Sequence, residues 1–421
     1  MKVGLAGLGC VASGFYKILQ NDKSLITKRT NQEIEIVAAA SRTKKDFLNP
    51  KIRFYDNVLD LARDPEVEVV IEAIGGKTIA KELIILAIKN GKKVITANKA
   101  LLAEDGLEIA KILEENNGFL AYEAAIGAAI PIVKNFKESF AGNEIQEFYG
   151  ILNGTSNFIL DKMQREKKNY QTVLEEAQKL GYAESNPTFD VGGIDAAHKL
   201  VLLAAIASNS KPNFKETYIE GIENITLEDI EIAGELDYKI KLLAIYRKNG
   251  DVYQQSIYPC LVKKDEKIAQ VDSSFNAILT LTSNANYSFV IGRGAGGLET
   301  GSAIASDVID IARGNCQSQL FNAKLSDLSS LKLLNIKDRF GQYFISLKLN
   351  KEVLKEENLA LKIFGNKLQL KQAHMINGED KILCAFITED LKETDLLKIL
   401  ENIDKNIASS VKFLRVESTN F

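Results

Sequence analysis

Residues 2–14 read KVGLAGLGCVASG, and this stretch decides the fold of the first part of the chain. The apolar run 2–6 predicts a buried strand, and the glycines that follow it open a pattern with helical spacing. In such a turn the glycines permit a tight bend and let the backbone approach a pyrophosphate, which the free N–H groups of the helix N-terminus then bind. The residues of this predicted dinucleotide-binding turn are Gly7, Leu8, Gly9, Cys10 and Val11. The alternative is a turn with a purely structural role.

Four further apolar runs follow, at residues 34–40, 67–74, 93–97 and 119–124. Helical patterns lie between the later runs, at 78–90 and 104–116. Apolar strands that alternate with helices are typical of a parallel sheet covered on both faces. We therefore predict the α/β fold class, with a Rossmann-like doubly wound parallel sheet in a domain of residues 1–130.

The remainder of the chain has a different texture. Residues 131–316 mix helices with alternating strands, which predicts an α+β domain, and we expect its last helix, about 300–313, to pack back on the first domain. Residues 317–335 resemble a linker. Residues 336–421 follow the order βαββαβ, with the first helix at about 351–363. This order predicts a ferredoxin-like module.

The composition excludes several classes of protein. Lys and Arg number 53 against 56 Asp and Glu, so no overall charge indicates nucleic acid or a membrane surface as a partner. Four scattered cysteines and two histidines exclude a disulfide framework and a multi-histidine metal centre. No uninterrupted apolar run reaches the length of a membrane span. We expect a soluble, cytoplasmic protein with a small-molecule substrate.

The end of the second predicted strand bears on the choice of dinucleotide. An acidic residue there would accept a hydrogen bond from a ribose 2′-hydroxyl and favour NAD. This chain has Ser41 and Arg42 instead, followed by two lysines. A guanidinium matches a 2′-phosphate in charge and geometry, so we predict NADP over NAD, with a solvated basic loop as the alternative.

Polar residues follow the fourth strand and recur on a later apolar helix. Residues 96–103 read TANKALLA, and the carboxyl end of a parallel strand would direct Lys99 toward the nicotinamide end of the crevice. On helix 194–208 the spacing places Asp195 and Lys199 one turn apart on an otherwise apolar surface, next to His198. Buried charges are costly unless they are paired or used, so we predict a site there and a packing role for His198.

At this point the chain resembles the homoserine dehydrogenase family. The resemblance rests on TANKALLA at 96–103, YEAAIGAAIPIV at 122–133, GILNGTSNFIL at 150–160, AESNPTFDVGGIDAAHKLVLLA at 183–204 and GRGAGGLETGSAIASDVIDIAR at 292–313, together with the glycine turn. The chain departs from the family at Ala12, Ser156 and Glu299, and none of these changes removes a residue whose chemistry the reaction needs.

The resemblance implies an NAD(P)-dependent enzyme that interconverts L-aspartate 4-semialdehyde and L-homoserine in threonine, methionine and isoleucine biosynthesis. It implies that residues 131–316 form the catalytic and dimerisation domain of a homodimer or homotetramer. The implied catalytic residues are Lys199 and Lys99, and the implied substrate-binding residues are Glu184, Asp190, Asp195 and Lys199. Further cofactor contacts are implied for Thr96, Lys99 and Gly297, and a monovalent cation, Na⁺ in our interpretation, for Glu123, Ile126, Ala128 and Ile130.

Two alternatives stay open from the sequence. One is another Rossmann semialdehyde dehydrogenase, although no cysteine lies in a recognisable nucleophile motif. The other is a non-catalytic NADP-binding regulator. Residues 336–421 resemble an ACT domain, which in some relatives binds threonine as an inhibitor. The turn at 349–354 lacks the glycine that such a ligand pocket usually needs, so we predict a retained fold with weak or absent threonine inhibition.

Overall fold

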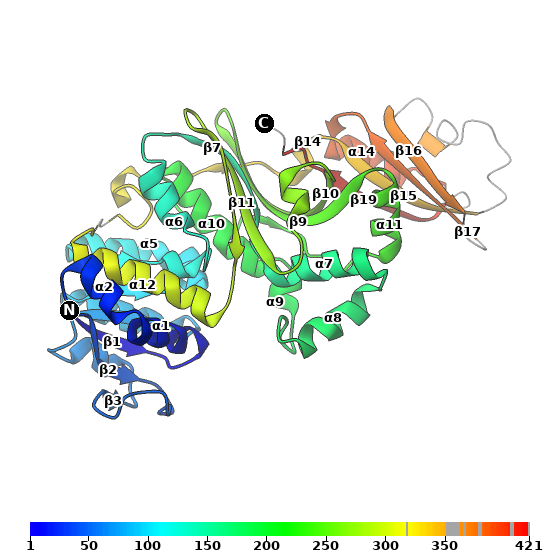
Figure 1. Ribbon diagram of the computed structural model, residues 1–421. Helices are drawn as coiled ribbons and strands as arrows, with labels where there is room; N and C mark the ends of the chain where they lie inside the picture. The colour runs from blue at the N-terminus through cyan, green and yellow to red at the C-terminus, as the bar shows by residue number, and fades with distance from the viewer. Residues whose placement is uncertain (317–318, 351–362, 365–367, 378–380, 405–407, 420–421) are drawn as a thin grey trace. The chain divides into compact units, whose positions relative to one another are not determined.

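The computed structural model describes residues 1–316, 319–350, 363–364, 368–377, 381–404 and 408–419 (Figure 1). The chain forms two compact units. The first comprises Met1–Glu147, Ala197–Thr217 and Thr280–Leu331, and the second comprises Phe148–Ala196, Tyr218–Leu279 and Lys332–Phe421. Each unit is assembled from separated segments, and the division into three consecutive domains stays a prediction. The helix expected at 351–363 lies outside the described residues except for residue 363. Residues 351–354 of the turn expected at 349–354 also lie outside them.

The first unit contains a six-stranded parallel sheet. Its strands are β1 (Lys2–Ala6), β2 (Glu35–Ala40), β3 (Arg53–Tyr55), β4 (Val69–Glu72), β5 (Lys93–Thr96) and β6 (Leu120–Ala121), in the order β3-β2-β1-β4-β5-β6. The connecting helices are α1 (Cys10–Asn21), α2 (Lys23–Thr30), α3 (Leu59–Arg63), α4 (Thr78–Lys89) and α5 (Lys99–Glu115). The strand order reverses between β1 and β4, where ligands bind in such sheets. The predicted Rossmann-like fold class is confirmed.

The first unit also includes segments from beyond the sheet. They are η1 (Glu123–Ala125), α6 (Ile132–Lys134), η2 (Asn135–Ser139), β12 (Asn286–Arg293), α12 (Gly297–Arg313) and η4 (Leu325–Asp327). Helix α12 packs along α1 at glycines (Figure 1). A Cβ atom on Gly14 would lie 1.9 Å from the carbonyl oxygen of Gly297, and one on Gly301 would lie 2.5 Å from the nitrogen of Phe15. Only residues without side chains allow two helix backbones to approach so closely.

The second unit is built on a mixed sheet. Strands β9 (Tyr238–Asn249) and β10 (Val252–Lys263) form a long antiparallel hairpin at its centre. Strands β7 (Ile145–Ile151) and β11 (Phe275–Thr282) continue the sheet on one side, while β8 (Tyr218–Ile219) and β13 (Lys332–Leu333) pair with β10. The helices are α7 (Gly154–Glu166), α8 (Tyr170–Lys179), α9 (Thr188–Val191), α11 (Leu227–Glu235) and the turn η3 (Lys267–Gln270). Helix α10 (Ile194–Ser208) runs continuously through the division between the units.

The C-terminal part of the second unit has the strand order β19-β15-β17-β16 and antiparallel pairing. Its elements are η5 (Ile336–Asp338), β14 (Phe340–Gly341), β15 (Tyr343–Asn350), β16 (Leu370–Asn377), β17 (Lys381–Thr388), β18 (Leu391–Lys392), α14 (Glu393–Glu401) and β19 (Ala408–Val416). Alternate residues of β15, from Tyr343 to Leu349, enter one apolar core with Leu396 of α14. Strand β19 also pairs in parallel with β10, so this part continues the central sheet.

Among the residues that the structure describes, no helix is both long enough and apolar enough to span a membrane.

Candidate active site

The glycine turn leaves an open approach to the N-terminus of α1. Gly7 has a φ of +85°, and a Cβ atom there would lie 2.4 Å from the carbonyl oxygen of Ala73, so only glycine fits this bend. Gly9 is the N-cap of α1 without any side-chain cap, and a Cβ atom there would meet nothing within 4 Å. Uncapped N–H groups that face open space are suited to a diphosphate.

Gly297 at the start of α12 lies directly against this turn. A Cβ atom on Gly297 would be 2.6 Å from the Sγ atom of Cys10 and 2.8 Å from its carbonyl oxygen. The N-cap of α12, Gly296, likewise makes no side-chain cap bond. The structure therefore places Gly297, predicted as a cofactor contact, beside Cys10 of the turn.

The basic loop follows β2 at the carboxyl edge of the sheet. The Oγ atom of Ser41 and the backbone of Thr43 hydrogen-bond each other, which closes a short turn. Arg42 is exposed on this turn, and Lys44 lies 5.9 Å from the ring centre of Phe54. An exposed guanidinium at this edge is free to meet an anionic group on an adenosine ribose.

The neighbouring strand ends carry a buried carboxyl that the sequence reasoning missed. Glu72 ends β4 with no exposed surface, and it accepts hydrogen bonds from the Thr96 hydroxyl and from the nitrogen of Ile74. Burial raises the pKa of Glu72, and these hydrogen bonds act against that rise. Thr96 also accepts from the nitrogen of Asn98, so its hydroxyl is engaged on both sides. Lys99 is the first residue of α5, directly after the N-cap Asn98.

Asn153 joins two of the predicted substrate carboxylates within the second unit. Its Nδ2 atom donates to Asp190 at 2.9 Å and to Asp195 at 3.0 Å. Its Oδ1 atom accepts from the nitrogen of Ser156 at 2.8 Å, which caps α7. The hydroxyl of Ser156 in turn donates to the carbonyl oxygen of Asp190. The Asn153 amide, two residues after the end of β7, thus holds the two carboxylates close together.

Glu184 stands apart from this group. Its side chain is exposed, and its carbonyl oxygen accepts a hydrogen bond from Gln178 at 3.0 Å. No contact joins the Glu184 carboxylate to Asp190 or Asp195 among the described residues. The structure therefore brings together two of the three predicted substrate carboxylates.

Helix α10 carries the remaining polar groups in a buried setting. Asp195 is 7% exposed and Lys199 is 6% exposed, and one helical turn separates them. His198 stacks on Phe214, with ring centres 4.4 Å apart, and its Nε2 atom lies 3.2 Å from Glu104. The stacking of His198 on Phe214 agrees with the packing role expected for it from the sequence.

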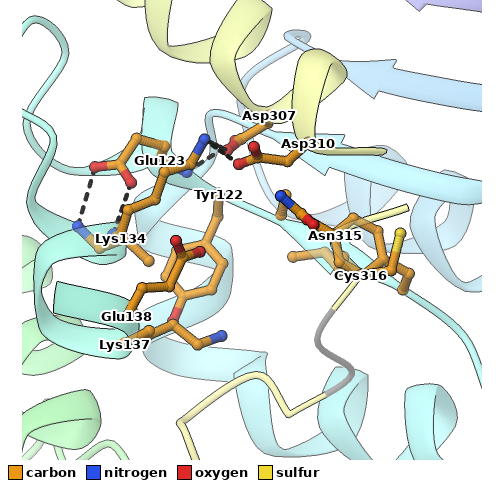
Figure 2. A pocket seen from close by; sticks show the side chains of 13 residues that line it. Tyr122, Glu123, Lys134, Lys137, Glu138, Asp307, Asp310, Asn315 and Cys316 are labelled. Atoms are coloured by element: carbon orange, nitrogen blue, oxygen red, sulfur yellow. Dashed lines mark hydrogen bonds and ion pairs between the residues drawn. The ribbon is translucent and has the colours of Figure 1, made fainter. Parts of the chain in front are cut away.

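The predicted cation loop follows β6 in the first unit. Both carboxylate oxygens of Glu123, labelled in Figure 2, accept backbone N–H groups of α6, from Ile132, Val133 and Lys134, at 2.6 to 3.0 Å. Burial raises the pKa of Glu123, and these three hydrogen bonds oppose the rise. The carboxylate is therefore occupied by backbone N–H groups, and the carbonyl oxygen of Glu123 accepts the N–H of Ile126 at 3.4 Å. No group of three His, Cys, Asp or Glu side chains suited to a metal occurs in the described part of the chain.

A polar pocket lies next to this loop. The amine of Lys134 lies 3.5 Å from the carboxylate of Asp307 and also contacts Asp310 (Figure 2). Asp307 accepts the N–H of Glu123 at 3.0 Å, and burial raises its pKa to about 8. Asp307 was not among the residues predicted from the sequence. Its signal in the sequence is a carboxylate on the apolar face of α12.

Two family models match this chain. The model described as "Homoserine dehydrogenase, NAD binding domain" covers residues 7–123, and the model described as "Homoserine dehydrogenase" covers residues 131–309. The chain belongs to the homoserine dehydrogenase family. It is 34% identical to the homoserine dehydrogenase of Helicobacter pylori over 99% of each chain. It is 41% identical to that of Neisseria gonorrhoeae over 74% of this chain and 72% of the relative.

A solved homoserine dehydrogenase from Thiobacillus denitrificans has the same fold over the whole chain. The TM-score is 0.92 at 34% identity, covering 100% of this chain and 99% of the other. Membership of the homoserine dehydrogenase family confirms the predicted NAD(P)-dependent oxidoreductase and does not favour the two alternatives.

Proposed function

We propose that this homoserine dehydrogenase uses Lys199 as its proton donor and acceptor, and NADP as its preferred cofactor. The observation that carries the assignment is the buried position of Lys199 on α10, one turn from a carboxylate that Asn153 fixes. The experiment that tests the whole function is homoserine-dependent reduction of NADP and of NAD, followed at the nicotinamide absorbance. An inactive protein with both cofactors would overturn it.

Reduction of L-aspartate 4-semialdehyde adds one hydride to the carbonyl carbon and one proton to the carbonyl oxygen. A bound nicotinamide would supply the hydride. The ammonium of Lys199 stabilises negative charge on that oxygen and gives it the proton. In the reverse direction the neutral amine takes the proton from the hydroxyl of homoserine. Lys99, at the carboxyl end of β5, is proposed as the second catalytic lysine.

The substrate's own charges are assigned to the carboxylates. Asp195 and Asp190, held on either side of the Asn153 amide, are proposed to hold the hydroxyl and ammonium end of the substrate. Lys199 contacts the reacting oxygen. Glu184 is proposed as a further ligand of the ammonium, which agrees with its exposed carboxylate.

The preference for NADP is proposed from the loop after β2. Arg42 is exposed on this loop, where enzymes that prefer NAD carry an acidic residue. A 2′-phosphate would therefore meet a guanidinium rather than a carboxylate that repels it. The turn residues, Gly7 to Val11, are proposed to hold the diphosphate, with Gly297 adjoining them. Because the hydroxyl of Thr96 is engaged by Glu72 and Asn98, we assign Thr96 a cofactor contact through its backbone.

A monovalent cation is proposed at the loop after β6. Ile126, Ala128 and Ile130 are at most 6% exposed, and their carbonyl oxygens accept no hydrogen bond from any described residue. Buried carbonyl groups are nearly always satisfied, so three such oxygens fit a hard cation such as Na⁺. Together with the carbonyl oxygen of Glu123 they form the proposed ligand set. Activity measured in Na⁺ and in tetramethylammonium salts at equal ionic strength tests the site.

The assembly and location follow from the same family resemblance. We propose a homodimer or homotetramer, to be measured by light scattering of the purified chain, and a cytoplasmic location. The pathway role in threonine, methionine and isoleucine biosynthesis is proposed with them.

A further inference from the structure

We propose that Arg415 on β19 is a positioning residue for the substrate carboxylates, acting through Glu220 and the segment 220–222. This inference rests on the proposed function of Asp190 and extends it to the C-terminal part of the second unit. All contacts in the chain of argument lie within that unit.

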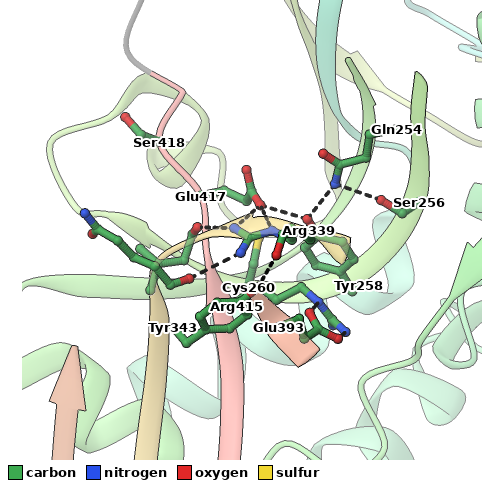
Figure 3. A network of polar contacts seen from close by, with 12 residues as sticks. Gln254, Ser256, Tyr258, Cys260, Arg339, Tyr343, Glu393, Arg415, Glu417 and Ser418 are labelled. Atoms are coloured by element: carbon green, nitrogen blue, oxygen red, sulfur yellow. Dashed lines mark hydrogen bonds and ion pairs between the residues drawn. The ribbon is translucent and has the colours of Figure 1, made fainter. Parts of the chain in front are cut away.

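The first step is the ion pair between Arg415 and Glu220. The Nη1 atom of Arg415 lies 2.8 Å from the Oε2 atom of Glu220. The Nε and Nη2 atoms of Arg415 each bind Glu393 at 2.8 Å, and Figure 3 shows these two side chains next to each other. Its guanidinium lies 4.9 Å from the ring centre of Tyr218 and 4.6 Å from that of Tyr258. The Tyr218 hydroxyl donates to the same Glu220 oxygen. Aromatic faces and two carboxylates therefore fix the guanidinium in one orientation.

The second step is the segment that Glu220 begins. The nitrogen of Glu220 donates to the carbonyl oxygen of Ile257 at 2.8 Å, and the nitrogen of Ile222 donates to that of Val191 at 2.9 Å. Between them, a Cβ atom on Gly221 would lie 2.4 Å from the same Val191 oxygen. The segment is thus pressed directly against the end of α9.

The third step is α9 itself, which spans Thr188–Val191 and includes Asp190. This helix has a single turn, so it cannot hold its own geometry without tertiary contacts. The hydrogen bond from Ile222 to Val191 fixes the residue next to Asp190. The orientation of the Asp190 carboxylate toward Asn153 therefore depends on where segment 220–222 lies.

A second buried ion pair lies just beyond the end of β19. Arg339 binds Glu417 at 2.6 Å, and the Tyr258 hydroxyl donates to Glu417 at 2.7 Å (Figure 3). The two arginine side chains are similarly buried, 4% exposed for Arg339 and 3% for Arg415, whereas Glu417 is 2% exposed and Glu220 is 35% exposed. No contact of Arg339 reaches residues 218–222 among the described residues. Arg339 therefore provides a matched control.

The experiment compares Arg415→Met and Glu220→Ala with Arg339→Met in the full chain. Glu220 has a side chain 35% exposed, so Glu220→Ala is expected to fold. Both variants of the Arg415–Glu220 pair should raise KM for homoserine about tenfold, the effect of losing one charge-assisted hydrogen bond, while KM for NADP stays unchanged. Glu220→Gln, whose amide oxygen still accepts from Arg415, should restore most of the affinity. Arg339→Met should lower Tm without changing KM for homoserine.

The outcomes separate this inference from the proposed function. If the wild-type chain shows no homoserine-dependent reduction of NADP or NAD, both fall. If the wild type is active and Glu220→Ala keeps its KM for homoserine, the positioning role is wrong and the function stands. An equal rise of KM in Arg339→Met would also contradict it, because general loosening of the packing around β19 would then explain the effect. The double variant Arg415→Met/Glu220→Ala gives a further check. If its KM for homoserine rises no more than in either single variant, the two residues act on the substrate site through the same contacts.

Discussion

Replacement of Lys199 by alanine gives the sharpest test of the catalytic assignment. Lys199 is 6% exposed, so its ammonium acts in surroundings with few water molecules. Two unit charges about 4 Å apart interact by about 4 kcal/mol at an effective dielectric constant of about 20, which is close to a thousandfold in rate. General acid catalysis alone contributes about 100-fold or more. We expect kcat of Lys199→Ala to fall by at least about 100-fold.

Two further variants separate proton transfer from charge and from folding. Lys199→Arg keeps a positive charge but cannot give up a proton near neutral pH, so its kcat should lie between those of alanine and wild type. Lys199→Met keeps most of the side-chain volume, and Asp195 stays hydrogen-bonded to Asn153, so its Tm should stay close to that of wild type. The assay is saturated homoserine oxidation with NADP, with cofactor affinity measured by NADPH fluorescence. A kcat above one tenth of wild type in Lys199→Ala would refute the reasoning.

Four other predictions address the cofactor, the pH dependence and regulation. Burial raises the pKa of Asp307 to about 8, whereas the carboxyl of the unfolded chain titrates near its ordinary pKa of 3.8. Between these two pH values the native state binds more protons than the unfolded state. The free energy of unfolding should therefore fall as pH rises, by at most about 1.4 kcal/mol per pH unit. Urea unfolding between pH 5 and 8 should show a flatter dependence in Asp307→Asn, and an unchanged slope would contradict the assignment. Arg42→Ala should raise KM for NADPH about tenfold or more and leave KM for NADH nearly unchanged; equal effects would mean that the guanidinium does not contact the 2′-phosphate. Gly9→Ala should keep its Tm and weaken NADPH binding, because its Cβ atom meets open space, whereas Gly14→Ala should lower Tm because its Cβ atom would lie 1.9 Å from the Gly297 oxygen; the reverse pattern would argue against a diphosphate at the turn. Threonine titrated into the enzyme should inhibit weakly or not at all, and inhibition at sub-millimolar threonine would show that prediction wrong.

The parallel sheet could be predicted because its signals are local. Each buried strand is a short apolar run, and the glycine turn marks the first crossover. Strand β3 (Arg53–Tyr55) gave no such signal, since three half-buried residues at a sheet edge show no periodicity. Helix α11 did carry a signal that the reasoning did not use: Thr226 and Asp229 form a capping box at its start. Helix α5 begins at Lys99 rather than at 104, because Asn98 caps it.

The site was harder to predict because its contacts are distant in sequence. Asp195 and Lys199 share one helix, so their spacing alone placed them together. Asn153 meets Asp190 and Asp195 from 37 and 42 residues away, and only the end of β7 brings its amide there. The use of the Glu123 carboxylate as a helix cap is equally a product of the folded loop. A sequence can indicate which residue types are present, but not which of their atoms are already engaged.

Strand β19 has a consequence for how the protein is made. It pairs with β15 on one side and with β10 on the other, and just beyond it Thr419 donates to the buried carboxylate of Glu266. A ribosome must therefore release residues 408–419 before the second unit can close. Until then the edge of β10 at Cys260 and Leu261 stays open to other strands. Closure by such sequence-distant pairing is slow, so nascent chains pass through an interval in which they are prone to aggregate, and slower, cooler expression should raise the yield of folded enzyme.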